Sequence, residues 1–450
     1  MAVTTRASGA PPLPAHPDAQ LDAVLGSKLP HELSYALGGP FHLLMPDRFD
    51  TNSTAFKHEL TEAGVQGQVY YAKKANKAAV WMDRCAVSGT GVDVASAGEL
   101  RDALGHGVRG EDVVVTGPAK AEGLLRVAVL HGCLIAVDAL DELERVIDQA
   151  QAAARPARVL LRRLPPAQPH SRFGLDDREL TSALARCAEA GDAVVMEGFS
   201  FHLSGYDTQA RGELAAELID LCLKARVLGL RADRISIGGG FAVDYTAAEH
   251  WERFLREQGP HDYHAGKSFT ASDFYPYHSP APGPAALRAI LTTDGLAGRL
   301  REAGVMLLLE PGRALLDRAG CTVFRVQGVK DRPGYGIVTV DGSSLSLSEQ
   351  WFNSEYLPDP VLLPAEATPG EPYAACVGGA TCLESDMVTW RKVRFRARPA
   401  VGDLLVYPNT AGYQMDSNES PFHELPLPRK VVLDTAGGTT RWRFDRPPLA

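Results

Sequence analysis

The sequence predicts a parallel (β/α)8 barrel of the TIM type followed by a mostly β C-terminal domain. Eight short apolar runs recur between residues 69 and 311, and each is followed by a stretch with helical spacing of its apolar residues. After about residue 317 the sequence pattern changes to short runs in which apolar and polar residues alternate, separated by Gly, Pro and Asp. A chain of 450 residues also exceeds one ordinary core, which favours two domains or a large barrel with an appendage.

The eight runs have the composition of strands that are buried on both faces. Such strands, alternating with helices, are typical of parallel β/α units. Eight units favour a closed barrel, while the pattern alone leaves an open doubly wound sheet as the alternative. The runs are VYYAKK (69–74), GVDVAS (91–96), DVVVTG (112–117), CLIAVD (133–138), RVLLRR (158–163), GFSFHL (198–203), RISIGG (234–239) and MLLLEP (306–311).

The domain organisation follows from these runs. Residues 1–37 are predicted to be an N-terminal tail, and 38–60 to contain a strand (GGPFHLLMP, 38–46) that joins the β domain and leads into the barrel. The barrel is expected over 61–316, interrupted by an inserted loop at about 255–285, and the β domain over 317–450. The runs CTVFRVQGVK, GIVTVDG, YAACVG, KVRFRAR, DLLVYP and KVVLDT are its expected strands.

The composition argues against several classes of protein. The chain is 45% apolar and 22% charged, which is ordinary for a globular protein. A net charge of −9 without a basic block argues against a nucleic-acid partner, and no apolar run approaches the ~20 residues of a membrane span. The seven cysteines are scattered without metal-ligand spacing, which favours a reduced, cytoplasmic chain with no metal site.

Polar residues stand at the ends of the predicted barrel strands, where barrel enzymes carry their chemistry. Lys74 ends an apolar strand, where it is either a Schiff-base lysine or a strand-end lysine that reaches water. Lys73 alternates to the opposite face and is the weaker candidate. Asp93 and His202 occupy equivalent ends, and His202 is either a ring-stacking residue or a core histidine.

The last two strand ends suggest a phosphate site. Gly238, Gly239 and Gly240 permit backbone N–H groups to approach an anion, although a tight turn would also use them. Arg313 could bind the same phosphate, and Glu310 could face the nitrogen of a pyridine ring or form a salt bridge with Arg313. A lysine, a phosphate cradle and an acid together suggest pyridoxal phosphate as the cofactor.

The motifs, in their order along the chain, resemble one known family. YAKKAN (71–76), GVDVASAGEL (91–100), FHLSG (201–205), ISIGGGF (235–241), EPGR (310–313) and TCLESD (381–386) are similar to motifs of the fold type III pyridoxal-phosphate decarboxylases. That is the diaminopimelate, ornithine and arginine decarboxylase group, whose barrel is alanine racemase-like. The resemblance covers roughly residues 38 to 430 and implies this fold and cofactor.

The resemblance also implies roles for individual residues. Lys74 would hold the cofactor, His202 would stack on its ring, and Glu310 would contact the ring nitrogen. Gly238, Gly239, Gly240 and Arg313 would bind its phosphate. Asp93 and Glu99 would support the lysine and cofactor, and Tyr413 would touch the cofactor. Cys382 and Asp386 would reach the site from the other subunit of a homodimer with shared active sites, with Cys382 as the proton donor.

The sequence departs from the family at several positions that touch substrate or phosphate. Ser204 lies one position earlier than the family's phosphate-binding serine, and Gly379-Ala380 replaces a Gly-Pro step. Leu383 stands where an acid often meets the distal end of a diamino acid, with Glu384 one residue later. No arginine follows Asp341-Gly342, where the diaminopimelate enzymes carry one, so diaminopimelate is an unfavoured substrate.

The inserted loop is rich in His, Tyr and Pro and follows the seventh strand, so it is expected to overhang the barrel mouth. It is either a lid or a structureless surface loop. As a lid it would offer the substrate contacts His264, Lys267, Tyr275, Tyr277 and His278.

The predicted function is α-decarboxylation of a small-molecule amino acid, free or bound to a carrier. A racemase or epimerase on the same fold is the alternative. A non-catalytic cofactor carrier is disfavoured because Cys382 and Asp386 are kept, and an inactive partner subunit is disfavoured because Lys74 is present.

Overall fold

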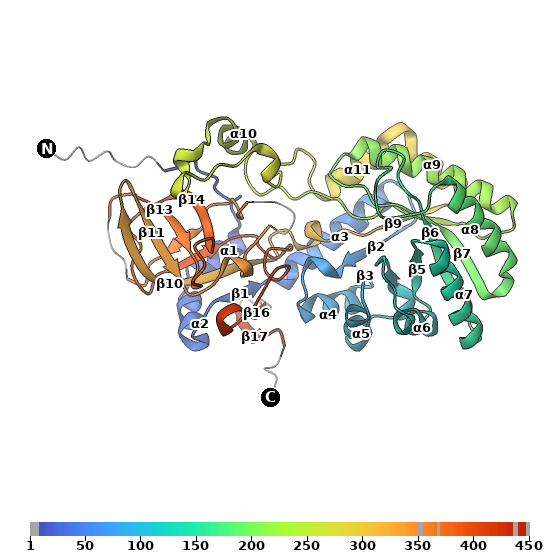
Figure 1. Cartoon of the computed structure of the whole chain (residues 1–450), viewed down its shortest axis with the longest axis horizontal. Coiled ribbons are helices and arrows are strands. Elements are labelled where there is room, and N and C mark those ends of the chain that lie inside the picture. The colour runs from blue at the N-terminus through green and yellow to red at the C-terminus, as the bar shows by residue number, and fades with distance from the viewer. Residues whose placement is uncertain (1–8, 350–353, 367–369, 435–439, 447–450) are drawn as a thin grey trace. The chain divides into compact units, whose positions relative to one another are not determined.

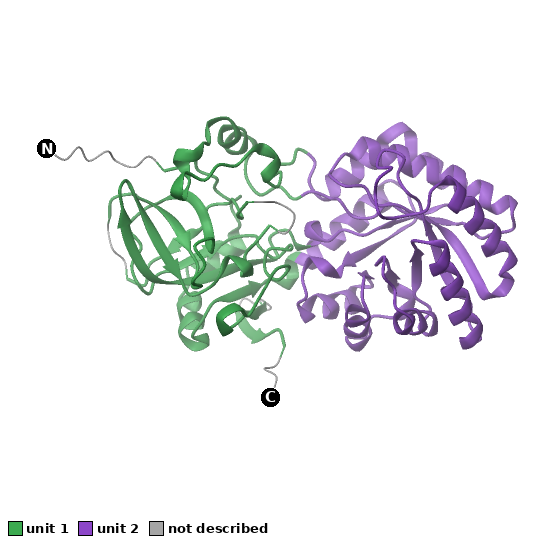
Figure 2. Ribbon diagram, in the orientation of Figure 1, with its two compact units in different colours: residues 1–48, 243–280, 316–450 green, residues 49–242, 281–315 purple. Residues whose placement is uncertain are grey.

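The computed structural model describes residues 9–349, 354–366, 370–434 and 440–446. The chain divides into two compact units (Figure 1, Figure 2). Residues 49–242 and 281–315 form one, called here the barrel unit. Residues 1–48, 243–280 and 316–450 form the other, called the sheet unit.

The barrel unit contains a closed parallel barrel built, in the described residues, from eight strands in chain order. Closure is direct, because the first strand pairs with the last in the register Gly67↔Leu307. The prediction of a closed barrel is therefore confirmed, and the open sheet is excluded. The strands are β2 (Gly67–Ala72), β3 (Gly91–Val94), β4 (Val113–Val115), β5 (Leu134–Val137), β6 (Ala157–Arg162), β7 (Val194–Ser200), β8 (Arg234–Ser236) and β9 (Met306–Leu309).

Helices alternate with these strands and surround the barrel (Figure 2). Helix α7 is a clear amphipathic example: it buries Leu143, Val146, Ile147 and Ala150 at the spacing of successive helical turns. The helices are α3 (Pro46–Glu62), α4 (Ala79–Ser88), α5 (Ala97–Gly105), α6 (Glu122–Leu130), α7 (Leu140–Ala153), α8 (Asp177–Glu189), α9 (Thr208–Val227), α11 (Pro284–Thr292) and α12 (Leu296–Ala303).

The sheet unit is built on a mixed, largely antiparallel sheet, as expected for the C-terminal part of the chain. Its strands are β1 (Phe41–Leu44), β10 (Gly320–Arg332), β11 (Tyr335–Val340), β12 (Val361–Leu363), β13 (Tyr373–Gly378), β14 (Met387–Phe395), β15 (Leu404–Tyr407), β16 (Arg429–Asp434) and β17 (Arg441–Phe444). The early strand β1 lies between β10 and β16, so residues ahead of the barrel are part of this sheet. Its apolar core also contains residues of α1 (Ala19–Leu25) and α2 (Leu29–Leu37).

The segment 243–280 differs from the sequence expectation because it groups with the sheet unit rather than with the barrel. It contains α10 (Ala248–Glu257), whose Trp251 and Phe254 stack on each other with ring centroids 5.7 Å apart. Tyr245, Tyr277 and Tyr356 form edge-to-face pairs with centroids 5.4–5.8 Å apart. Burial of these rings fixes the segment to the sheet unit.

The N-terminal residues also differ from the expected tail, because residues 9–37 are folded onto the sheet unit. Leu13 and Asp359 exchange two hydrogen bonds, and the Thr246 hydroxyl donates to the Pro14 carbonyl at 2.7 Å. Asp18 caps α1 and pairs with Arg48 at 2.6 Å. A proline-rich segment forms few hydrogen bonds of its own, so its carbonyl groups are available to these donors.

No helix among the described residues combines the length and the apolar character that a membrane crossing requires. All seven cysteines are free; six are buried and Cys382 is exposed.

Candidate active site

Two adjacent lysines at the end of β2 have different surroundings. Lys73 is buried, and its Nζ lies 2.7 Å from Asp102 Oδ2 on α5. Lys74 is exposed at the carboxyl end of the strand. Because the carboxyl ends of barrel strands surround one mouth, Lys74 is the lysine available for chemistry there.

Two carboxyl groups share this end of the barrel. Asp93 on β3 accepts a hydrogen bond from Thr116 Oγ1 at 2.5 Å, and Glu310, next after β9, accepts one from Ser236 Oγ at 2.5 Å. Loss of solvation raises the pKa of both groups, and the negative charge of Asp93 contributes to raising the pKa of Glu310 to about 7. Glu310 is therefore poised to hold or release a proton near neutral pH.

The three glycines after β8 form a backbone cradle. Gly238 has φ +66°, and a Cβ there would lie 2.8 Å from His202 Nδ1; a Cβ on Gly239 would lie 2.8 Å from the Glu310 carbonyl oxygen. Gly240 has φ +81° and lies against the guanidinium of Arg211. Any side chain here would collide with the site, which leaves the backbone free to approach an anion.

Desolvation, together with the positive charges of Lys74, Arg162 and Arg211, lowers the pKa of His202 to about 3. The imidazole is therefore neutral at physiological pH. An uncharged ring suits stacking on an aromatic cofactor better than a cation with its own hydration shell.

Four contributors to the site were not predicted from the sequence: Thr116, Ser236, Arg162 and Arg211. Arg162 lies 3.2 Å from Asp138 and over the Phe173 ring at 4.5 Å. The sequence feature that could have identified Arg162 as a site residue is its position near the end of the strand-like run RVLLRR. Arg211 is inside α9, where no strand-end pattern marks it; it is fully buried and its Nε has no hydrogen-bond partner among the described residues. Burial lowers the pKa of Arg211 to about 10.

Comparison with known proteins agrees with this geometry. Residues 47–258 match the family described as pyridoxal-dependent decarboxylase, pyridoxal binding domain. An uncharacterized protein of Sinorhizobium fredii is 40% identical over 410 residues, 89% of each chain. A diaminopimelate decarboxylase of Actinosynnema pretiosum is 27% identical over 87% of this chain and 83% of its own. The chain belongs to the pyridoxal-dependent decarboxylase family.

Solved structures of the family show the same fold. The M. jannaschii diaminopimelate decarboxylase in complex with L-lysine aligns with a TM-score of 0.73 at 20% identity, over 93% of this chain and 91% of its own. The Vibrio vulnificus lysine/ornithine decarboxylase complexed with putrescine aligns with a TM-score of 0.70 at 21% identity, over 90% and 97%. At these identities the likeness establishes the fold, and it confirms the predicted architecture.

Pyridoxal phosphate, the cofactor of this family, fits the residues at the barrel mouth. The glycine cradle suits its phosphate, the neutral His202 ring suits its pyridine face, and Glu310 suits its ring nitrogen. Arg313 begins the short helix after β9 and is buried. Ser204 is exposed next to Gly205, and no distance places it on phosphate.

The predicted residues of the sheet unit have unequal surroundings. Cys382 is exposed, and its backbone N–H donates to His423 Nε2 at 3.4 Å; Glu384 is exposed as well. Asp386 is buried and accepts from Ser344 N at 2.8 Å and from the Thr381 hydroxyl at 2.8 Å. Its carboxylate therefore organises its own loop. Tyr413 is largely buried with φ +77°.

The residues expected to form a lid lie among packing partners. Tyr275 and Tyr277 have no exposed surface. His278 Nδ1 lies 2.9 Å from Asp244, and His264 bonds to the Tyr335 hydroxyl at 3.0 Å. Lys267 lies over the Trp390 ring at 3.9 Å. These contacts give the segment a packing role within the sheet unit. No group of three or more described His, Cys, Asp or Glu side chains is arranged to hold a metal ion.

Proposed function

We propose that the protein is an amino-acid α-decarboxylase that releases carbon dioxide and an amine. The observation that carries the proposal is Glu310, a carboxyl group with a pKa of about 7, held by Ser236 beside the glycine cradle and on the same barrel mouth as Lys74. When bound, pyridoxal phosphate supplies a ring that accepts the electrons released as the α-carboxylate leaves.

Residues of the chain would bind the cofactor, orient it and supply the proton that the reaction needs. Lys74 Nζ would hold the cofactor. Glu310 would contact the ring nitrogen, and its raised pKa would let it share a proton there near neutrality. The glycine cradle and Arg313 would bind the phosphate and so orient the ring. Lys74 Nζ or Cys382 Sγ would supply the proton that replaces the carboxylate on the α-carbon.

The substrate is a small amino acid, free or attached to a carrier, and diaminopimelate is not favoured. Leu383 is exposed at the position where an acid often meets a distal amine, and Glu384 beside it is also exposed. Asp386 already accepts hydrogen bonds within its own loop, so it is a weak candidate for a distal ammonium group.

The experiment is incubation of the purified holoenzyme with pooled L- and D-amino acids in deuterated water, followed by mass spectrometry and NMR. An amine with one deuterium at the former α-carbon is the expected product. Intact amino acid with deuterium at the α-carbon would instead identify a racemase or epimerase, which is the second candidate because both reactions need the same cofactor site.

A further inference from the structure

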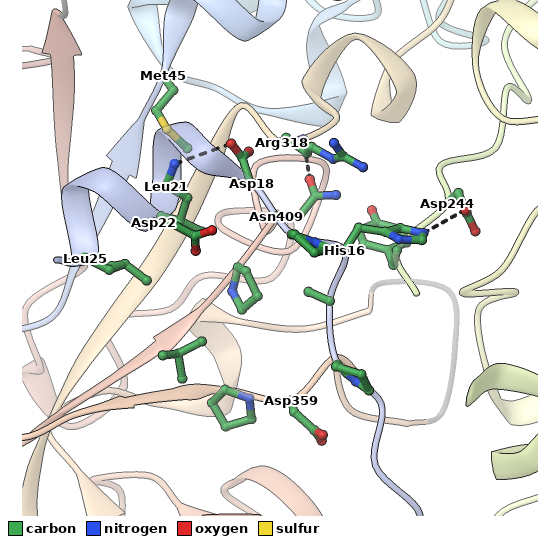
Figure 3. Close-up of a pocket in the computed structure, with 17 residues that line it drawn as sticks. His16, Asp18, Leu21, Asp22, Leu25, Met45, Asp244, Arg318, Asp359 and Asn409 are labelled. Atoms are coloured by element: carbon green, nitrogen blue, oxygen red, sulfur yellow. Dashed lines mark hydrogen bonds and ion pairs between the residues drawn. The ribbon is translucent and has the colours of Figure 1, made fainter. Parts of the chain in front are cut away.

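A cavity lies within the sheet unit, and none of the predicted active-site residues lines it. It has a volume of about 230 Å³ and is bounded by residues 14–18, by α1, and by residues 359–361 and 408–409 (Figure 3). Because one water molecule needs only ~10–15 Å³ of such space, the cavity has room for a small metabolite.

Much of the cavity wall is apolar. Leu21 and Leu25 project from α1, and Met45, Pro360 and Val361 line other parts of the wall. Val361 is 40% exposed, so the apolar wall continues to the opening. An aliphatic group fits such a surface because it removes apolar area from water.

One cation lines the cavity. The backbone N–H of Arg318 donates to Asn409 Oδ1 at 2.6 Å, and Asn409 in turn donates to Asp317 at 2.8 Å. Arg318 and Asn409 have φ of +55° and +54°, a region that non-glycine residues occupy at a cost in energy. In the described part of the chain, no group accepts a hydrogen bond from the Arg318 guanidinium.

Two of the four acids that line the cavity pair with arginine. Asp18 pairs with Arg48 at 2.6 Å, and Asp359 pairs with Arg391 at 2.7 Å. Asp244 lies between His16 and His278 at 2.8 and 2.9 Å. The remaining acid, Asp22, is exposed on α1, the helix that also carries Leu21 and Leu25 (Figure 3). Arg318 is the lining residue whose guanidinium can donate hydrogen bonds to an anionic ligand.

We propose that this cavity binds a small aliphatic carboxylate, with its carboxylate on the Arg318 guanidinium and its hydrocarbon part against Leu21, Leu25 and Val361. The planar guanidinium matches a carboxylate with two parallel hydrogen bonds. The ligand would connect the N-terminal segment to the sheet strands around it. The proposal does not depend on the reaction at the barrel mouth.

The test uses isocaproate and its neutral isostere isocaproamide, which carry no amine that can react at Lys74. Isothermal titration calorimetry of the holoenzyme should show one isocaproate site with a Kd of about 1 mM or tighter. Isocaproamide should bind about tenfold more weakly or worse, because it lacks the charge-assisted hydrogen bonds.

Three variants locate the site. Arg318→Gln should weaken isocaproate binding by about tenfold or more, and Val361→Trp should block it by filling the cavity. Arg429→Gln, at an exposed arginine of the same unit outside the cavity, should leave binding unchanged. Absence of isocaproate binding to the wild type, or binding that survives either cavity variant, would overturn the proposal. If Arg318→Gln does not fold, Val361→Trp decides, since Val361 is partly exposed.

Discussion

Neighbouring residues of one strand end can have opposite roles, as Lys73 and Lys74 show. Lys73 is buried and paired with Asp102, so its charge is neutralised behind the barrel wall. Lys74 is displaced onto the mouth because the extended strand stops at Ala72 and a short 3-10 turn begins. The sequence predicted different surroundings for the two lysines from strand alternation, whereas in the structure a 3-10 turn separates them.

Glu310 should make the stability of the apoprotein depend on pH. Its native pKa of about 7 lies above the usual 4.5, so the native state binds more protons than the unfolded state between these values. The free energy of unfolding should therefore fall as pH rises from about 4.5 to about 7, by about 3 kcal/mol at most. Glu310→Gln should remove most of this slope in urea unfolding series.

The matched control for Glu310→Gln is Glu302→Gln, at an exposed position on α12. That variant should keep the wild-type slope. An unchanged slope in Glu310→Gln would show that the raised pKa belongs to another group, with Asp93 as the first alternative.

Other residues of the site were beyond prediction from the sequence for a physical reason. Ser236 and Thr116 act by bonding to Glu310 and Asp93, which are 74 and 23 residues away. Arg211 comes from the interior of a helix, where an arginine is ordinarily a solvated residue. Such pairings depend on the tertiary fold, and no local pattern records them.

At the scale of elements, the turn after β8 combines two demands on glycine. Gly238 needs a positive φ and also space beside His202. Gly229, in the loop before β8, also has a positive φ, of +79°. It lies in open space, however, with no atom within 4 Å of where an alanine Cβ would lie. Alanine at either position should cost about 1 kcal/mol of folding free energy for the backbone conformation. Only Gly238→Ala should also lower the affinity for pyridoxal phosphate, by about tenfold or more.

The measurement for this pair is cofactor titration of the apoprotein by absorbance, with urea unfolding of both variants. Equal cofactor affinities in Gly238→Ala and Gly229→Ala would contradict a phosphate cradle at Gly238. The comparison separates the cradle from general backbone strain, because both variants carry the strain.

The placement of segment 243–280 in the sheet unit could not be predicted from the local sequence pattern. The barrel strands were predictable because strands buried on both faces are apolar throughout. The packing role of Tyr277 was not predictable from the sequence, because its partner Tyr356 lies 79 residues later in the chain. A His- and Tyr-rich segment after a barrel strand has the same local composition whether it covers a mouth or packs on another unit.

Tyr277→Ala should therefore act on stability. Its ring has no exposed surface and packs on Tyr245, Tyr275 and Trp251, so truncation should lower the free energy of unfolding by about 3–5 kcal/mol. His278→Ala, at a half-buried neighbour, should cost about 1 kcal/mol. A Tyr277→Ala variant with unchanged stability and a raised KM for substrate would favour a lid.

At the scale of the whole molecule, the sequence resemblance implies a homodimer with shared sites. The exposed Cys382 is suited to such a role, whereas Asp386 is committed to its own loop. We therefore expect Cys382 to be the residue that one subunit contributes to the barrel mouth of the other, and Asp386 to hold the Cys382 loop in place.

Mixing inactive variants tests this assembly. Lys74→Ala and Cys382→Ala should each abolish or strongly slow amine formation. Random exchange of subunits gives about half heterodimers, and each would have one site with both residues intact, so about a quarter of wild-type activity should return. The matched control mixes Lys74→Ala with Glu310→Gln. Both residues belong to the same barrel mouth, so no heterodimer site has both residues intact, and the mixture should show no more activity than the two variants measured separately. Equal recovery in the two mixtures, or none in the first, would contradict a site shared between subunits.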